Sequence, residues 1–323
     1  MHRPPIASHA LSPRIDVAIR AIAGFVAVAA MVYLMLAVWV GREEVGESVT
    51  GLGALALLGG ALVASVNYLM RFARWEDILR RMSQRIPLRD NLRVYIGGLA
   101  LTATPGKIGE TIRSALLVRW HVPVGASLAA LFIDRLTDLA GVLLLAAIAD
   151  PGLLWWLLAA LAVGFGIALR WAFSTRYVET VAKELERRHR LATVVAFLRG
   201  GMTHYLAAWR FPAVIAYVFI ALVAYGIQGL VFAGYVRALW GGCGLLQALH
   251  IFATATLIGA ASMLPGGLGA MELALIAQLH AIGMPLAQAT AAAVAVRAVT
   301  LWFGILAGLV CLLWYRRRAA IVQ

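Results

Sequence analysis

The sequence predicts an all-α, polytopic membrane protein with about seven or eight transmembrane helices. Hydrophobic residues make up 63% of the 323-residue chain and charged residues only 13%, whereas about a quarter is usual in soluble domains. The apolar stretches reach about 20 residues, the length that an α-helix needs to cross a bilayer. They also lack the strict alternation of a transmembrane β-strand, so helices are favoured over a barrel.

The charge distribution points to a membrane and not to nucleic acid. The net charge is +13, but the arginines gather beside apolar stretches, which is typical of cytoplasmic loops and of contact with anionic lipid headgroups. No nucleic-acid recognition motif accompanies them. Cys243 and Cys311 lie far apart and the seven histidines are scattered, so we expect no disulfide framework, no metal site and no cofactor.

The first quarter of the chain predicts a basic cytoplasmic tail and two spans. Residues 1–16 form the tail, and the apolar run 17–40 is longer than the 7–15 residues or so of a signal-peptide core, which indicates a retained anchor. Residues 41–50 hold three glutamates and one arginine, as expected of a loop outside the membrane, and 51–70 spans back. Residues 71–93 carry seven arginines and are predicted to be a cytoplasmic loop.

The next apolar stretch, 94–118, is interrupted at Pro105-Gly106 and flanked by Arg93 and Arg119. Each arm has about a dozen residues, or roughly 18 Å of helix, which is too short for a hydrocarbon core of about 30 Å. The stretch therefore predicts a re-entrant hairpin that enters from the cytoplasmic side.

The remaining chain continues the single membrane domain to residue 315. Spans are predicted at 124–149, 153–173, 212–236 and 289–314, with a basic, partly amphipathic cytoplasmic loop at 174–211. Residues 245–282 contain a second Pro-Gly break and form either two crossings or one hairpin that enters from outside. Residues 316–323 begin with three arginines, so both termini are expected in the cytoplasm.

The two Pro-Gly breaks are part of a longer repeat. From Glu110 it is thirteen residues to Pro123 and twelve more to Arg135; from Glu272 it is thirteen to Pro285 and twelve more to Arg297. The matching hinge positions are Pro105, Gly106 and Gly109 in the first copy and Pro265, Gly266, Gly267 and Gly269 in the second. Chance alignment of common glycines and alanines is the alternative to a duplication. The arginine placement makes the halves, about 94–173 and 212–315, an inverted repeat, as secondary transporters use.

A small set of charges falls within the predicted membrane segments. The acidic ones are Glu110, Asp134, Asp138 and Glu272, and the basic ones placed to match them are Lys107, Arg113, Arg135 and Arg297. Because an isolated charge in lipid costs several kcal/mol, we expect Glu272 to pair with Arg297 and, by the repeat, Glu110 with Arg135. These residues either lock hairpins to helices or bind substrate, the arginines holding a phosphate headgroup while the acids gate or carry protons.

Three motifs together resemble the lysylphosphatidylglycerol synthase transmembrane region, the flippase-like membrane domain of the multiple peptide resistance factor. They are Thr-Pro-Gly-Lys-Ile-Gly-Glu at 104–110 with Arg113, Asp-Arg-Leu-Thr-Asp at 134–138, and Leu-Pro-Gly-Gly-Leu-Gly-Ala-Met-Glu at 264–272 with Arg297. The resemblance implies a multi-pass protein of a bacterial or archaeal cytoplasmic membrane that moves lipids or lipid-linked groups between leaflets. The chain ends after its last predicted span, so we expect no soluble aminoacyl-transferase domain and no lysyl transfer.

Three functions remain open from the sequence. The first is a translocase, not an enzyme, for an anionic or amino-modified phospholipid. The second is an accessory subunit that positions a glycosyltransferase or another lipid-modifying enzyme. The third is an intramembrane enzyme acting on a lipid phosphate, which is disfavoured because the sequence has no metal-ligand cluster and no CDP-alcohol transferase pattern around Asp134 and Asp138.

Overall fold

The computed structural model describes residues 24–29, 31, 33, 35, 38, 41–100, 110–150, 152–174 and 192–321, and these form helices and turns but no strands. The helices are α2 (Arg42–Arg81), α3 (Leu88–Ala100), α4 (Glu110–Leu117), α5 (Val124–Ala149), α6 (Leu153–Ser174), α8 (Ala192–Ala208), α9 (Phe211–Leu239), α10 (Leu245–Ala261), α11 (Ala270–Ala281), α12 (Leu286–Arg297) and α13 (Phe303–Ile321). A π-helical segment, Ala298–Trp302, makes α12 and α13 one continuous helix.

Three of the described helices are long and apolar enough to cross a membrane: Glu43–Arg81, Phe211–Leu239 and Leu286–Trp314. Two shorter apolar helices, Leu154–Arg170 and Leu245–Ala261, accompany them. α5 is 26 residues long, but Asp134, Arg135 and Asp138 interrupt its apolar sequence. The sequence therefore identified helices correctly at 124–149, 153–173 and 212–236, while the full number of crossings stays a prediction.

The structure differs from the sequence-based expectation along α2. The expected outer loop at 41–50 and the start of the expected loop at 71–93 are both helical, because α2 continues for 40 residues with one kink at Gly53, where φ is 76°. Residues 88–93 belong to α3, so only the short connection at 82–87 is irregular. Arg71 and Arg74, at the end of the apolar run, remain within the helix because they have acidic partners on α5, Asp138 and Asp134.

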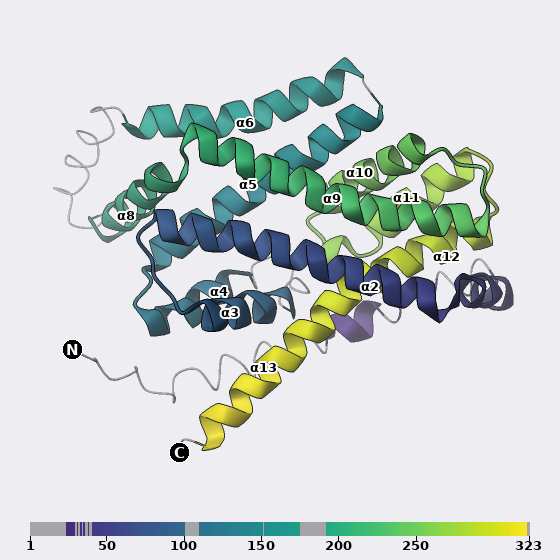
Figure 1. Cartoon of the computed structure of the whole chain (residues 1–323), viewed down its shortest axis with the longest axis horizontal. Coiled ribbons are helices and arrows are strands. Elements are labelled where there is room, and N and C mark those ends of the chain that lie inside the picture. The colour runs from purple at the N-terminus through teal and green to yellow at the C-terminus, as the bar shows by residue number, and fades with distance from the viewer. Residues whose placement is uncertain are drawn as a thin grey trace.

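The long helices lie side by side along the long axis of the bundle, and the short helices occupy its two ends (Figure 1). α5 packs on α6 and α9, and α2 packs on α9 and α12. α3 and α4 lie together at one end against α13, whereas α10 and α11 lie together at the other end. Two main apolar cores follow this division: one joins α2, α3, α5, α8 and the first half of α9, and the other joins the second half of α9 with α10, α11 and α12.

One glycine allows α5 to approach α9 closely. A Cβ placed on Gly141 would lie 2.6 Å from the Cβ of Ala221 and 2.8 Å from the backbone nitrogen of Leu222. Gly141→Ala should therefore destabilise the protein by a net amount of about 1–2 kcal/mol, because the steric clash outweighs the gain in helix propensity. Thermal or denaturant unfolding in detergent micelles measures this difference.

Gly234→Ala in α9 is the matched control, since nothing lies within 4 Å of the Cβ position there. Its free energy of unfolding should stay unchanged or rise by up to about 1 kcal/mol. Equal effects of the two substitutions would contradict the close contact between α5 and α9.

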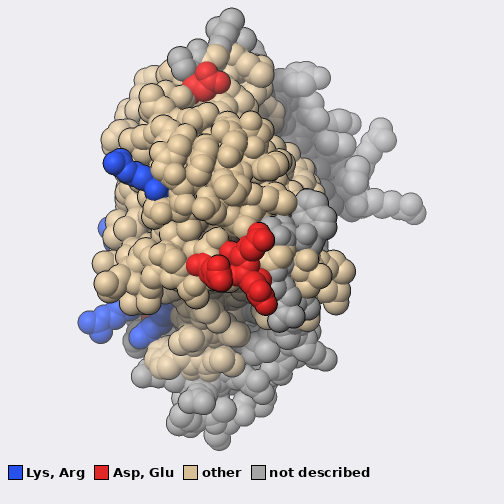
Figure 2. All heavy atoms as spheres, turned by 90° about the vertical axis from the view of Figure 1, so that its right-hand side faces the viewer, with Lys and Arg blue, Asp and Glu red and all other residues tan. Residues whose placement is uncertain are grey.

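The two ends of α2 carry opposite charges. Glu43, Glu44 and Glu47 are exposed near its first turn, and Figure 2 looks at this end of the bundle, where acidic side chains gather in one patch. At the other end the exposed arginines Arg80 and Arg81 close the helix, and Arg85 and Arg89 follow within the next eight residues. Charge is thus separated along the long axis.

Candidate functional site

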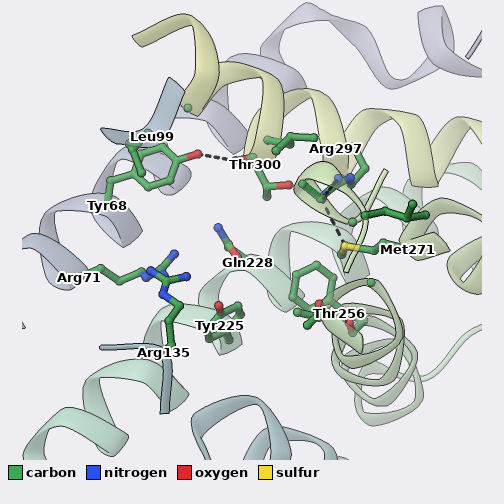
Figure 3. A pocket seen from close by; sticks show the side chains of 18 of the residues that line it. Tyr68, Arg71, Leu99, Arg135, Tyr225, Gln228, Thr256, Met271, Arg297 and Thr300 are labelled. Carbon is green, nitrogen blue, oxygen red and sulfur yellow. Dashed lines mark hydrogen bonds between the residues drawn. The ribbon is translucent and has the colours of Figure 1, made fainter. Parts of the chain in front are cut away.

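A cavity of about 550 Å³ lies inside the bundle, and side chains of α2, α3, α5, α9, α10, α11 and α12 line it (Figure 3). Its lining includes three arginines: Arg71 of α2, Arg135 of α5 and Arg297 of α12. Other polar side chains around it are Tyr68, Tyr225, Gln228, Thr256 and Thr300. No aspartate or glutamate belongs to the lining among the described residues, so the cavity presents cationic groups inside an apolar helix bundle.

The second Pro-Gly break forms one wall of this cavity. Pro265–Gly267 makes a single 3₁₀ turn between α10 and α11, and Gly266, Gly267 and Gly269 all have positive φ, at 59°, 66° and 80°. A Cβ on Gly267 would lie 3.1 Å from the backbone oxygen of Gly259 in α10. The glycines are therefore needed for both the left-handed backbone and the close approach to α10.

The first break lies outside the described residues, and with it Pro105, Gly106, Lys107 and Gly109. α3 ends at Ala100 and α4 begins at Glu110, so the two flanking helices are described but the connection is not. The backbone of Glu110 is part of α4, and nothing is described of its side chain. The expected pairing of Glu110 with Arg135 therefore stays a prediction.

The expected pair of Glu272 and Arg297 is present. Arg297 Nε donates to Glu272 Oε1 over 2.8 Å, and the exposed fractions of the two side chains are 7% and 0%. The hydroxyl of Tyr33 donates to the same carboxylate oxygen, also over 2.8 Å. Arg297 Nη2 donates to the backbone oxygen of Gly266 over 2.6 Å, which ties α12 to the break.

A π-helical segment begins directly after Arg297. Within it, the backbone oxygen of Thr300 accepts a hydrogen bond from the hydroxyl of Tyr68 on α2. Trp302 Nε1 donates to the hydroxyl of Tyr33 over 3.2 Å, which connects the segment to the Glu272 network. π-Helical turns are rare and frequently occur at functional sites, and this one forms part of the cavity wall.

The opposite wall carries a largely buried cluster of three arginines and two aspartates from α2 and α5, in which Arg135 is the most exposed side chain, at 28%. Arg74 Nη2 donates to Asp134 Oδ1 and to Asp138 Oδ1, both over 2.6 Å, with Arg74 and Asp134 fully buried. Arg71 donates to Asp138 Oδ2. Arg135 Nη2 donates to Asp134 Oδ2 over 2.6 Å, and its Nη1 lies 3.4 Å from Asp138 Oδ2.

Sequence reasoning placed Asp134, Arg135 and Asp138 together but missed Arg71 and Arg74, which it assigned to a cytoplasmic loop. A signal was present: these two arginines are three residues apart and so share one helix face, directly after an apolar run. Aspartates four residues apart on another span can pair with two arginines on such a face. The arginine-rich sequence around them instead led to a cytoplasmic loop being predicted, by the positive-inside rule.

Arg113 is buried but does not line the cavity. It is 2% exposed, and its guanidinium carbon lies 4.8 Å from the ring centre of Trp75 and 4.7 Å from that of Tyr95. Cation–π contacts of this kind stabilise a desolvated guanidinium. Its expected role in substrate binding has no support from this position, which is between α2, α3 and α4.

Comparison with protein families identifies a match over most of the chain. Residues 21–308 match the family described as "Lysylphosphatidylglycerol synthase TM region", which agrees with the resemblance carried by the Pro-Gly, Asp-Arg and Glu/Arg motifs. No curated protein matches the chain.

Proposed function

Because the chain belongs to the lysylphosphatidylglycerol synthase transmembrane-region family, we propose that it moves a phospholipid or lipid-linked group between the leaflets of a bacterial or archaeal cytoplasmic membrane. The polar headgroup passes through the central cavity while the acyl chains stay in the bilayer. The single observation that carries this proposal is the 550 Å³ cavity with three arginines in its lining. Burying such charge within a membrane is costly and marks substrate pathways.

The arrangement of the short helices supports a transport function. α3 and α4 lie at one end of the long axis and α10 and α11 at the other, as expected of two hairpins that enter from opposite sides. α11 has 12 residues, or about 18 Å of helix, which is too short to cross the bilayer core. We therefore favour one re-entrant hairpin over two crossings for α10 and α11, and an inverted repeat with the site near the midplane.

The charge separation along α2 supports an orientation. Exposed arginines at its C-terminal end, Arg80 and Arg81, and in the following segment, Arg85 and Arg89, face the cytoplasm by the positive-inside rule. The acidic end with Glu43 and Glu44 then faces outward. α13 runs toward the same end of the bundle as the C-terminal end of α2 (Figure 1), which supports a cytoplasmic C-terminus.

Leaflet exchange in proteoliposomes tests the proposal. Dithionite quenches fluorescent phosphatidylglycerol only in the outer leaflet of the liposomes, so a translocase that brings label outward from the inner leaflet increases the fraction that is quenched over time. We expect exchange well above that of empty liposomes. Thr256→Trp should lower the rate at least tenfold, because Thr256 lines the cavity and a bulky ring there obstructs the path.

Ile258→Trp is the matched control. Ile258 is two residues away on α10 and 48% exposed on the outer surface, so this variant should exchange lipid at the wild-type rate. Exchange no faster than in empty liposomes for several headgroups, with folded protein, refutes translocation of those lipids. A stable lipid-modifying enzyme or glycosyltransferase in a pull-down, together with no exchange by the protein alone, would instead support the accessory role.

A further inference from the structure

A second cavity, of about 500 Å³, lies between α6 and α9, two helices that each pack on α5. Six of its lining residues lie on one face of α9 between Phe211 and Leu222, and Val163, Ile167 and Arg170 lie one turn apart on α6. We call this cavity the α6–α9 groove. Its lining shares no residue with that of the central cavity, and its volume falls within the range of about 300–1,000 Å³ typical of ligand sites.

The α6–α9 groove opens toward the hydrocarbon of the membrane. Ile167, Ile215 and Phe219 line it and are exposed on the surface of the bundle, and α9 is one of the helices long and apolar enough to cross a membrane. Residues 211–222 span about 16 Å of helix, or about half of a hydrocarbon core of about 30 Å. The groove therefore has the length of one leaflet and a surface that suits an acyl chain.

Arg170, near the C-terminal end of α6, is the one charged residue in the described lining of the groove. Its Nη1 donates to the backbone oxygens of Leu206 over 2.6 Å and of Trp209 over 2.8 Å, carbonyls at the end of α8 that have no partner within the helix. Among the described residues, Nε and Nη2 of Arg170 make no hydrogen bond. The guanidinium is thus held in place while the edge formed by Nε and Nη2 stays available.

A second donor adjoins this end of the groove. Trp209 lines the groove, and its indole ring lies against Gly166 of α6, where a Cβ would collide with it. Trp209 Nε1 is buried and has no hydrogen-bond partner among the described residues. Unsatisfied buried donors are rare in folded proteins, and a bound ligand is one explanation for them. Polar groups therefore gather at one end of an otherwise apolar groove.

We propose that the α6–α9 groove holds one acyl chain of a membrane phospholipid, with the phosphate of that lipid against Arg170. Inside a bilayer an acyl chain gains little by moving from lipid to an apolar protein surface. Retention of the lipid must therefore come from the phosphate, whose oxygens fit the two parallel donors of a guanidinium edge.

The place of Arg170 in the bundle fixes the leaflet of this lipid. α6 ends, and α9 begins, at the end of the bundle where α2 also ends (Figure 1). The phosphate then lies in the leaflet on that side, which is the cytoplasmic one in the orientation proposed above. The site rests on the proposed function only for this orientation and not for lipid translocation.

Photo-crosslinking of the purified full chain in nanodiscs tests the site. The probe is phosphatidylglycerol with a diazirine in the middle of one acyl chain, and diacylglycerol with the same chain is the matched probe without a phosphate. Mass spectrometry of the peptides locates the label. We expect phosphatidylglycerol to label Val163, Ile167 and residues 214–222 at least fivefold more than diacylglycerol does.

Arg170→Gln should lower the labelling of the groove by phosphatidylglycerol at least fivefold. Glutamine can still donate to the carbonyls at the end of α8, but it has neither the charge nor the guanidinium edge, so this variant separates lipid binding from the capping of α8. Arg237→Gln is the matched control, because Arg237 is exposed on α9 and lies outside the groove lining. Its labelling should equal that of the wild type.

Ile215→Trp decides if Arg170→Gln fails to fold. Ile215 is exposed at the rim of the groove, so an indole ring there fills the groove without disturbing the core and should lower the labelling at least fivefold. Leu230→Trp is its control, because Leu230 is exposed on the same helix but outside the groove lining.

Three results would overturn the site. They are equal labelling by the two probes, label spread evenly over the exposed residues of α2 and α9 as expected of bulk lipid, and unchanged labelling in folded Arg170→Gln or Ile215→Trp. Thr256→Trp obstructs only the central cavity, so it should leave labelling of the groove unchanged. Groove labelling without leaflet exchange refutes translocation and leaves this site standing, whereas exchange without groove labelling does the reverse.

Discussion

Asp134→Ala should be strongly destabilising, lowering the free energy of unfolding by about 3–5 kcal/mol. Asp134 is fully buried and accepts hydrogen bonds from both Arg74 and Arg135. Without it, Asp138 is the one described carboxylate left beside the fully buried guanidinium of Arg74. Uncompensated charges in a low-dielectric interior are far more costly than the loss of a surface pair.

Denaturant or thermal unfolding in micelles measures this effect, and Asp90→Ala is its control. Asp90→Ala removes the same charge as Asp134→Ala. However, the side chain of Asp90 is 32% exposed and pairs with Arg93, whose side chain is 38% exposed. Because surface ion pairs contribute about 0–1 kcal/mol, this variant should unfold nearly as the wild type does. A similar small effect at Asp134 would contradict a tightly paired buried cluster.

Arg297→Ala should cost about 3–5 kcal/mol, because among the described residues it leaves the fully buried carboxylate of Glu272 with only the hydroxyl of Tyr33 as donor. The double substitution with Glu272→Ala removes both charges, so it should be more stable than the sum of the two single effects predicts. Coupling energies of neighbouring residues reach 0.5–3 kcal/mol, and a double-mutant cycle measures them directly.

The same double variant distinguishes a structural role of Arg297 from a role in lipid binding. If Arg297 only ties α12 to α11 and Gly266, the folded double variant should exchange lipid at a rate near that of the wild type. Loss of lipid exchange in a double variant that folds would instead make Arg297 part of the lipid path. Purely additive single effects would argue against the pairing itself.

The two predicted ion pairs, Glu272 with Arg297 and Glu110 with Arg135, rested on different kinds of sequence evidence. Glu272 and Arg297 could be paired beforehand because each was costly to bury alone and no acidic residue shared the helix of Arg297. The repeat predicts that Arg135 pairs with Glu110, a contact that lies outside the described side chains, and the described partners of Arg135 are its own neighbours Asp134 and Asp138. Spacing along the chain thus shows which charges need a partner, whereas only packing shows which partners a charge has.

Composition, apolar run length and the Pro-Gly breaks were enough to determine the all-helical class, the bounds of α5 and α6, the break at Pro265–Gly267 and the family. These properties are local, since burial in lipid requires each span to satisfy its own backbone. Only the tertiary structure decided that Arg71 and Arg74 belong to the interior. Their cost of burial is offset by aspartates about 60 residues away in sequence, and no local pattern records that contact.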